Sequence, residues 1–479
     1  MGILGKDNEA VSAQQIGHAL QQMKKAHLDE GPPSLEKRLD RLDRAITLLV
    51  ENSSALAQAV SDDFGNRSIE QTLLADVGSS IATLKHTKAH LAQWMQAQSF
   101  DSPFPGTTTR VHYQPLGVVG VVSPWNFPII LAFGPLAGII AAGNRAMLKP
   151  SELTPRTSAL LAELIAQHFD EREITVVLGG KDTGTLFSAQ PFDHLIFTGS
   201  TSVGKHIMRA AAQNLVPVTL ELGGKSPVII SRSAPLQTAV QRILTVKTFS
   251  AGQICLSPDY VLVPEDALEA FVALAKSAIA QMYPSLKDNQ QYTSIINPAN
   301  FERLQSYLSD ARAKGAKVIE INPLNEDLSD SQLRKIAPTL VVDVTDDMLV
   351  LQEEIFGPIL PIKTYSTFSE AIDFVNQLPR PLAAYYFGEN PKEHQQVLER
   401  TTSGAVVIND VMTHVFVDDL PFGGVGYSGI GAYHGAQGFK TFSHAKSVLV
   451  QSAGGESNLP MRAPYGELTN AVIDSLLQS

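Results

Sequence analysis

The chain has 479 residues, 44% of them hydrophobic, which is long enough for two or three domains with large cores. Its 37 lysines and arginines against 48 aspartates and glutamates give a formal net charge of −11, which disfavours nucleic acid as a partner. A single cysteine excludes an internal disulfide framework and a four-thiolate zinc site. We therefore predict no metal site, and the cysteine usage fits a reducing compartment.

The N-terminus lacks the long apolar core and cleavage-like end of a secretory signal. The most apolar run, residues 128–143, contains Pro135 and is shorter than the ~20 residues that a membrane span needs, so we predict a buried helix there. We therefore expect a cytoplasmic protein that does not bind membranes.

Residues 10–96 carry apolar side chains at helical spacing and no chemical motif. From Val118 onward, short apolar strands alternate with helices, which predicts a doubly wound parallel sheet, and a second such series begins near Ser226. The expected strands include 118–122, 146–149, 174–178, 194–197, 227–230 and 260–263, and the expected helices include 157–169, 203–214, 236–254 and 268–282.

The fold class predicted from this order is α/β, with two doubly wound α/β domains. Residues 1–96 and 117–222 form the first, Rossmann-like domain in this prediction, and residues 223–415 form the second. The Thr-rich segments 97–116 and 440–453 look like edge strands, which usually need a partner. We expect them to pair as a β-arm for oligomerisation, in a homodimer.

The single cysteine, Cys255, follows an apolar stretch that we expect to be helical, residues 249–255. Taken alone, a buried cysteine is usually a small hydrophobic residue in a core. A catalytic role for Cys255 depends on whether other segments supply the remaining groups of a thiol-based reaction.

Two such groups stand at predicted strand ends. Asn126 follows Trp125 where open α/β sheets place ligands, and a neutral amide stabilises a developing oxyanion without titrating. Its alternative role is that of a turn asparagine. Glu221 lies among apolar residues, which raises a carboxyl pKa and makes a usable base. The alternative for Glu221 is a buried ion pair with Lys225.

A glycine turn joins the strand at 193–197 to a helix and contains Gly199 and Gly204. Glycines permit close backbone approach, and a helix N-terminus favours a phosphate-type anion. The spacing is a near miss to a nucleoside-triphosphate loop, because His206 stands where Ser or Thr would hold magnesium. The standard dinucleotide pattern is also not met.

Lys149 and Glu152 follow another predicted strand and are placed to reach the hydroxyls of an adenine ribose. An acidic group there favours a free 2′-hydroxyl, and hence NAD over NADP. The alternative is an ordinary solvated helix start capped by Ser151.

Seven motifs occur in the order found in the aldehyde dehydrogenase superfamily, which the chain resembles over nearly its whole length. They are PWNFP at 124–128, LKPSE at 148–152, FTGST at 197–201, LELGGK at 220–225, GQIC at 252–255, EIFGP at 354–358 and PFGGVG at 421–426. The segments 428–435 and 441–444 resemble the class 3 branch, and within it the coniferyl aldehyde dehydrogenases.

The resemblance implies NAD-dependent oxidation of an aldehyde to the carboxylic acid, with NADP also possible. Cys255 would attack the carbonyl, Asn126 and the Cys255 backbone N–H would hold the oxyanion, and Glu221 would activate the water that hydrolyses the thioester. The implied cofactor-binding residues are Ser123, Trp125, Lys149, Glu152, Gly199, Ser200, Gly204, Glu354 and Phe356.

Ile254 and the pair 256–257 make the wall around the cysteine apolar, which favours an aromatic aldehyde such as coniferaldehyde or a medium-chain aliphatic one. Three alternatives stay open. An acylating dehydrogenase would pass the thioester to coenzyme A, a scaffold protein would have no activity, and a thiol protease would pair Cys255 with His434 or His444.

Overall fold

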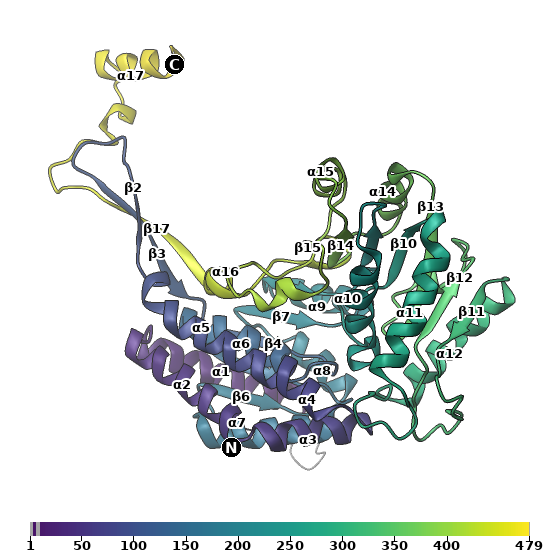
Figure 1. Ribbon diagram of the computed structural model, residues 1–479. Helices are drawn as coiled ribbons and strands as arrows, with labels where there is room; N and C mark the ends of the chain where they lie inside the picture. Colours follow the sequence, from purple (N-terminus) through teal and green to yellow (C-terminus); the bar gives the residue numbers. More distant parts are fainter. Residues whose placement is uncertain (1–2, 6–9, 479) are drawn as a thin grey trace.

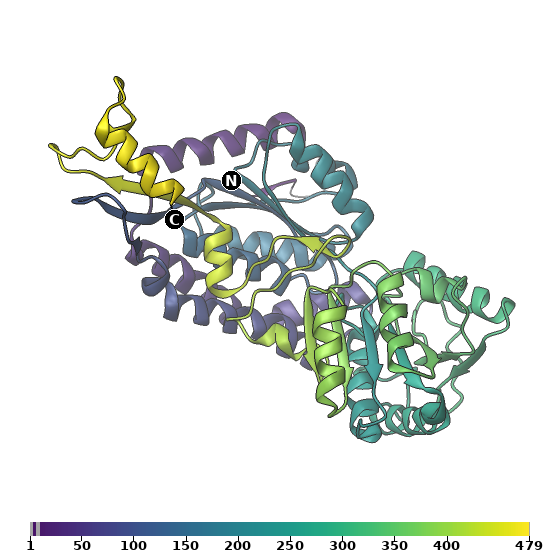
Figure 2. The same ribbon diagram turned by 90° about the horizontal axis from the view of Figure 1, so that it is seen from above.

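The computed structural model describes residues 3–5 and 10–478. Two seven-stranded sheets stand side by side, each with its own helices, and a three-stranded arm projects away from them (Figures 1 and 2). The α/β class and the two doubly wound units are as predicted.

The first sheet has the order β1-β6-β5-β4-β7-β8-β16. All neighbours run parallel except β16, which pairs antiparallel with β8 and joins the sheet from far along the chain. The strands are β1 (Ile3–Leu4), β4 (Val118–Val122), β5 (Arg145–Lys149), β6 (Ile174–Val177), β7 (His194–Thr198), β8 (Val218–Glu221) and β16 (Gly429–Ile430).

Helices cover both faces of this sheet, because alternate side chains of each strand enter two separate cores. Val119 and Val121 of β4 pack with one helical layer, whereas Val118 packs with the other. The first layer contains α2 (Leu35–Glu51), α3 (Ser53–Phe64), α4 (Ile69–Thr72), η2 (Leu73–Gly78), α5 (Ser79–Trp94), α6 (Ile130–Ala142) and α7 (Pro155–His168), and the second contains α1 (Ala13–Glu30), α8 (Lys181–Ser188) and α9 (Thr201–Ala212).

The predicted buried helix is α6, which is buried on all sides in its central turns and contains Pro135. Within the described residues, no helix combines the length and the apolar character that a membrane crossing would require.

The second sheet has the order β11-β12-β13-β10-β9-β14-β15, parallel except for the pair β11 and β12. Its strands are β9 (Pro227–Ile230), β10 (Tyr260–Pro264), β11 (Lys317–Glu320), β12 (Thr339–Val342), β13 (Ile359–Tyr365), β14 (Ala383–Phe387) and β15 (Ala405–Ile408). Its helices are α10 (Leu236–Thr248), η4 (Glu265–Ala267), α11 (Leu268–Met282), α12 (Pro298–Ala313), α13 (Leu349–Gln352), α14 (Phe368–Gln377) and α15 (Pro391–Arg400).

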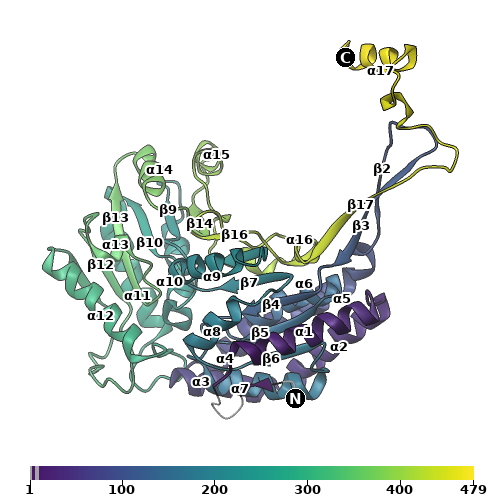
Figure 3. The ribbon, with the colours of Figure 1, turned by 180° about the vertical axis from the view of Figure 1, so that it is seen from behind.

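The arm consists of β2 (Gln98–Phe100), β3 (Thr108–Pro115) and β17 (Ser443–Val450), with β3 in the middle and both pairs antiparallel. The predicted pairing of the two Thr-rich segments is thus confirmed. The second strand starts at Ser443 because the residues before it form α16 (Gly435–Thr441). Beyond the arm lie η6 (Leu459–Met461) and α17 (Glu467–Leu477), at its far end (Figure 3).

The predicted helix over 236–254 is wrong in its last turns. Helix α10 stops before the 3₁₀ turn η3 (Phe249–Gly252), in which Ser250 and Ala251 have φ of 49° and 51° and Gly252 has φ of 72°. Positive φ cannot continue a right-handed helix. Cys255 therefore lies in an irregular turn after a strained backbone segment, and not on a helix.

Candidate active site

Cys255 lies where two cavities meet. One cavity, called the polar cavity below, has the larger share of polar lining, and the other, the apolar cavity, is lined almost entirely by apolar atoms. Both are lined by Leu131, Phe422 and Cys255 itself. A nucleophile at such a junction is open to two different ligands at once.

The polar cavity opens at the carboxyl ends of three neighbouring strands, β4, β7 and β8, where open α/β sheets bind ligands. On the side of the second sheet the cavity is lined by residues of α12, by the segment before β13 and by Leu382 before β14. The predicted site residues that line it are Trp125, Asn126, Gly199, Ser200, Glu221, Cys255, Glu354 and Phe356.

Four predicted cofactor residues do not line this cavity. Ser123 is buried beneath it, and its hydroxyl has no hydrogen-bond partner among the described residues. Gly204 lies in α9, where a Cβ would come within 2.8 Å of the Leu222 side chain, so it permits close packing of helix on sheet. Lys149 and Glu152 form an ion pair of 3.2 Å, and Glu152 lines a separate cavity beside the start of α8.

Glu221 ends β8 and is buried without any partner. Neither carboxylate oxygen accepts a hydrogen bond from the described residues, and burial raises the pKa of Glu221 well above its ordinary value. The alternative ion pair with Lys225 is not formed, because Lys225 donates to Asp259 instead. An unpaired buried carboxylate beside a nucleophile is suited to act as a base.

Burial, together with the nearby charges of Glu354 and Glu221, raises the pKa of the Cys255 thiol to about 12. The backbone N–H groups of Cys255 and Leu256 act in the opposite direction, since they hydrogen-bond the sulfur. The thiol is therefore protonated at neutral pH in the protein alone, and it needs a base in order to react.

Asn126 is held on both its side chain and its backbone. Its Nδ2 donates to the carbonyl of Gln253 at 3.2 Å, and its own carbonyl accepts a short hydrogen bond from the Arg67 guanidinium. Because Gln253 belongs to the irregular turn before Cys255, the amide and the thiol are positioned by the same backbone segment.

The sequence analysis missed two buried charged residues, Arg67 and Asp76, in the N-terminal helical region, where it found no chemistry. Arg67 is 1% exposed and packs its guanidinium over the ring of Phe127. Asp76 accepts hydrogen bonds from the N–H groups of Ile129 at 3.1 Å and Ile130 at 2.6 Å, at the start of α6. Together they fix the segment that carries Asn126.

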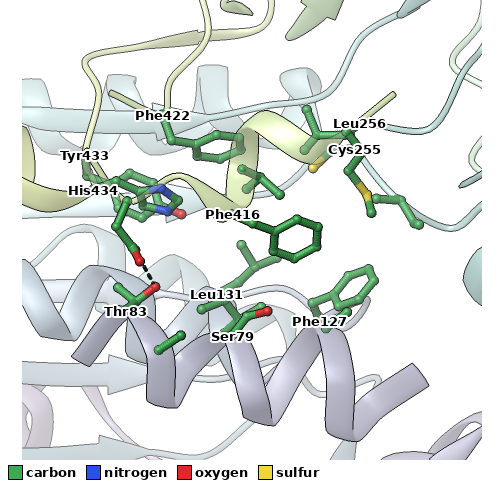
Figure 4. A pocket seen from close by; sticks show the side chains of 17 residues that line it. Ser79, Thr83, Phe127, Leu131, Cys255, Leu256, Phe416, Phe422, Tyr433 and His434 are labelled. Atoms are coloured by element: carbon green, nitrogen blue, oxygen red, sulfur yellow. Dashed lines mark hydrogen bonds between the residues drawn. The ribbon is translucent and has the colours of Figure 1, made fainter. Parts of the chain in front are cut away.

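The apolar cavity lies between helices α5 and α6 and the segment that contains η5 (Thr413–Phe416) (Figure 4). Aromatic side chains form much of its wall, which suits a planar apolar ligand. These aromatic residues are Phe127, Phe416, Phe422 and Tyr433.

A family comparison agrees with this geometry. The model of the aldehyde dehydrogenase family matches residues 6–448. The chain belongs to the aldehyde dehydrogenase family. It is 68% identical, over the full length of both chains, to a coniferyl aldehyde dehydrogenase of Pseudomonas sp. (strain HR199 / DSM 7063). Class 3 relatives include the aldehyde dehydrogenase family 3 member A2 of Mus musculus, 39% identical over 90% of this chain and 87% of the relative.

Solved structures share the fold. A substrate-bound state of Staphylococcus aureus AldH superimposes with a TM-score of 0.90 at 34% identity, covering 96% of this chain and 99% of the other. A Staphylococcus aureus betaine aldehyde dehydrogenase in complex with NAD+ gives a TM-score of 0.84 at 27% identity, covering 93% and 89%. The resemblance inferred from the seven motifs is confirmed.

The residues around the polar cavity of this aldehyde dehydrogenase fit a nicotinamide dinucleotide. Ser200 caps the start of α9, whose N-terminus favours a phosphate group. The unpartnered oxygens of Glu221 and the hydroxyl of Ser123 leave buried polar atoms for a ligand or its water to satisfy. Among the described residues, no group of His, Cys, Asp and Glu could hold a metal ion.

The protease alternative has no support in this geometry. His434 lines the apolar cavity, but its ring stacks on Phe422 with centroids 5.1 Å apart, and no hydrogen bond joins it to Cys255 within the described chain. His444 lies on β17 of the arm. A dyad needs a nucleophile and base within hydrogen-bond reach.

The raised thiol pKa predicts how the protein reacts with iodoacetamide in the absence of cofactor. The alkylation rate of Cys255 should rise about tenfold per pH unit from pH 7 to beyond pH 10, because the thiolate fraction keeps growing below a pKa of about 12. Mass spectrometry of the single cysteine measures the rate. A plateau above pH 9, as for a free thiol such as glutathione, would contradict this account of the site.

Proposed function

We propose that this aldehyde dehydrogenase oxidises aromatic aldehydes of the coniferaldehyde type to their carboxylic acids. The proposal rests mainly on the position of Cys255 between an aromatic-walled cavity and a cavity that contains the unpaired Glu221. The 68% identity to a coniferyl aldehyde dehydrogenase supports the same substrate class.

The first step assigned to the chain is attack of the Cys255 sulfur on the aldehyde carbonyl. The thiol must lose its proton, and Glu221 is an unpaired carboxylate near enough for its charge to raise the thiol pKa. Because burial makes Glu221 a stronger base than an exposed carboxylate, the two pKa values lie closer together and proton transfer costs less.

The resulting tetrahedral thiohemiacetal carries an oxyanion. The Asn126 amide has a second N–H beyond the one bound to Gln253, and we assign it to this oxygen together with the Cys255 backbone N–H. The role needs a rigid donor, and Asn126 is rigid because its carbonyl is held by Arg67.

A bound nicotinamide dinucleotide supplies the oxidising ring that takes up the two electrons and the aldehyde hydrogen. We assign Glu354 and Phe356 to the nicotinamide side and Gly199 and Ser200 to the pyrophosphate side, with Gly204 letting α9 pack close to the sheet there. Ser123 and Trp125 are further cofactor-binding residues in this proposal, and Lys149 and Glu152 are assigned to the adenine ribose. The exposed carboxylate of Glu152 favours the free 2′-hydroxyl of NAD, and NADP remains a weaker alternative.

Hydrolysis of the Cys255 thioester completes the reaction. Glu221 removes a proton from water, which attacks the thioester carbonyl, and the acid and the free thiol are released. An acylating enzyme would need no such base, so the unpaired Glu221 favours water over coenzyme A as acceptor.

Glu221→Gln should separate the two halves of the reaction. With coniferaldehyde and NAD, we expect reduced cofactor up to one equivalent per Cys255, followed by steady turnover that is slower by about 10²–10⁴-fold, the usual contribution of a general base. Stopped-flow absorbance measures both phases. Cys255→Ser should give no burst.

The outcomes discriminate between mechanisms. Raising the pH should speed the burst of Glu221→Gln, because the thiolate then forms without a base. If Glu221→Gln turns over at the parent rate, Glu221 is not the base that drives hydrolysis of the thioester. If turnover appears only when coenzyme A is added, the acylating alternative is favoured.

We further infer a homodimer built through the arm, with residues 1–96 and 117–222 as cofactor domain, 223–415 as catalytic domain and 97–116 with 440–453 as the arm. Strand β17 has an open edge and exposes Leu449, and β2 exposes Phe100. The single unpaired cysteine supports a cytoplasmic location.

Light scattering should give twice the chain mass of 51.7 kDa. Leu449→Glu places a charge on the exposed edge strand and should shift the protein toward the monomer. A monomeric mass for the parent protein at micromolar concentration would contradict the assembly.

A further inference from the structure

Polar side chains line one side of the apolar cavity. Figure 4 shows Cys255 at one side of the cavity and Thr83 and His434 at the other, with Phe422, Phe416 and Leu131 between them. Asp418 lines the cavity next to Thr83, and the dashed line in the figure marks the hydrogen bond between them. A substrate bound at Cys255 and extended along the aromatic wall therefore reaches these groups.

Asp418 is only partly engaged by the protein. Thr83 donates to one carboxylate oxygen at 2.7 Å, and in the described part of the chain no cationic side chain pairs with the carboxylate. The neighbouring Asp419 differs, since it lies 3.2 Å from the ring nitrogen of His86 and its side chain is 75% exposed. The second oxygen of Asp418 is thus available to a ligand in the cavity.

The surroundings select the chemistry of that ligand. Burial and the nearby His414 lower the pKa of His434 to about 4, so its ring is neutral and supplies no positive charge beside Asp418. A carboxylate only accepts hydrogen bonds, and it repels an anionic group. The aromatic wall excludes strongly hydrated groups over the rest of the cavity, so the matching ligand is a flat apolar molecule with one neutral donor at its far end.

We propose that Asp418, positioned by Thr83, accepts a hydrogen bond from a ring hydroxyl of the aromatic aldehyde whose carbonyl meets Cys255. The inference rests on the proposed aromatic substrate and adds the residue that selects hydroxylated rings. Thr83 is a positioning residue, because it holds one oxygen of a carboxylate that lines the cavity and leaves the other oxygen for the substrate.

The test compares coniferaldehyde with the same molecule lacking the ring hydroxyl, 3-methoxycinnamaldehyde, by their kcat/KM values. A hydrogen bond to a charged acceptor should favour the hydroxylated aldehyde by about tenfold in the parent enzyme. Asp418→Asn and Thr83→Val should each bring this ratio close to one. Asp419→Asn is the matched control and should keep the parent ratio, because Asp419 pairs with His86 outside the cavity.

Each outcome decides a different point. A parent ratio near one, or a ratio that Asp418→Asn leaves unchanged, overturns the hydroxyl subsite while the oxidation of both aldehydes upholds the aromatic substrate. Equal losses with both aldehydes would assign Asp418 to holding the wall of the cavity only. If the parent enzyme oxidises neither aldehyde, the proposal that its substrate is an aromatic aldehyde is wrong.

Discussion

The site depends on placing a buried carboxylate beside a partly buried thiol, with no cation paired to either group among the described residues. In the described part of the chain the Glu221 carboxylate has no hydrogen-bond partner, and Lys225, the nearest cation in sequence, pairs with Asp259. Such burial opposes folding, because desolvation disfavours the charged forms of both groups. Packing of the two sheets has to offset this free-energy cost. It keeps the Cys255 thiol and the Glu221 carboxylate close together, which is the arrangement that proton transfer between them requires.

The surrounding residues fix the position of the Cys255 thiol relative to the Glu221 carboxylate. The positive φ values at Ser250 and Ala251 end helix α10 early and turn the chain so that Cys255 enters the junction of the cavities. The backbone N–H of Ser250 donates to the Gln71 side chain at 3.0 Å, which ties this turn to the first helical layer. Arg67 from the same region holds Asn126, so one part of the chain orients both Cys255 and Asn126.

Much of the fold could be predicted because its signals are local. The strands 118–122 and 227–230 and the helix 268–282 have the bounds expected from their apolar patterns, and the boundaries of the other predicted helices on the first sheet differ by about two residues. The early end of α10 could not be predicted, since Ser and Ala at positions 250 and 251 do not indicate positive φ. The edge strand β16 is too short to show a pattern.

The site residues that stand in a sequence motif could be predicted. The residues that reach the site through contacts between distant parts of the chain could not. Cys255, Glu221 and Asn126 stand in quoted motifs and line one cavity. Arg67 and Asp76 act on residues 59 and 53 positions away, and Asp418 meets Thr83 across 335 positions, so only the folded chain brings them together. The partnership of Lys225 with Asp259, which removes the ion pair considered for Glu221, is likewise visible only in the folded chain.

The central claim is that the Cys255 thiol is acylated and that the buried Glu221 carboxylate then releases the acid. The most direct test is to trap the thioester. Glu221→Gln is mixed with coniferaldehyde and NAD, quenched in acid and measured by intact-protein mass spectrometry. The account predicts a mass increase equal to the coniferoyl group, located on Cys255 by peptide mapping and absent without NAD. An unmodified Cys255 after reduced cofactor has formed would contradict it.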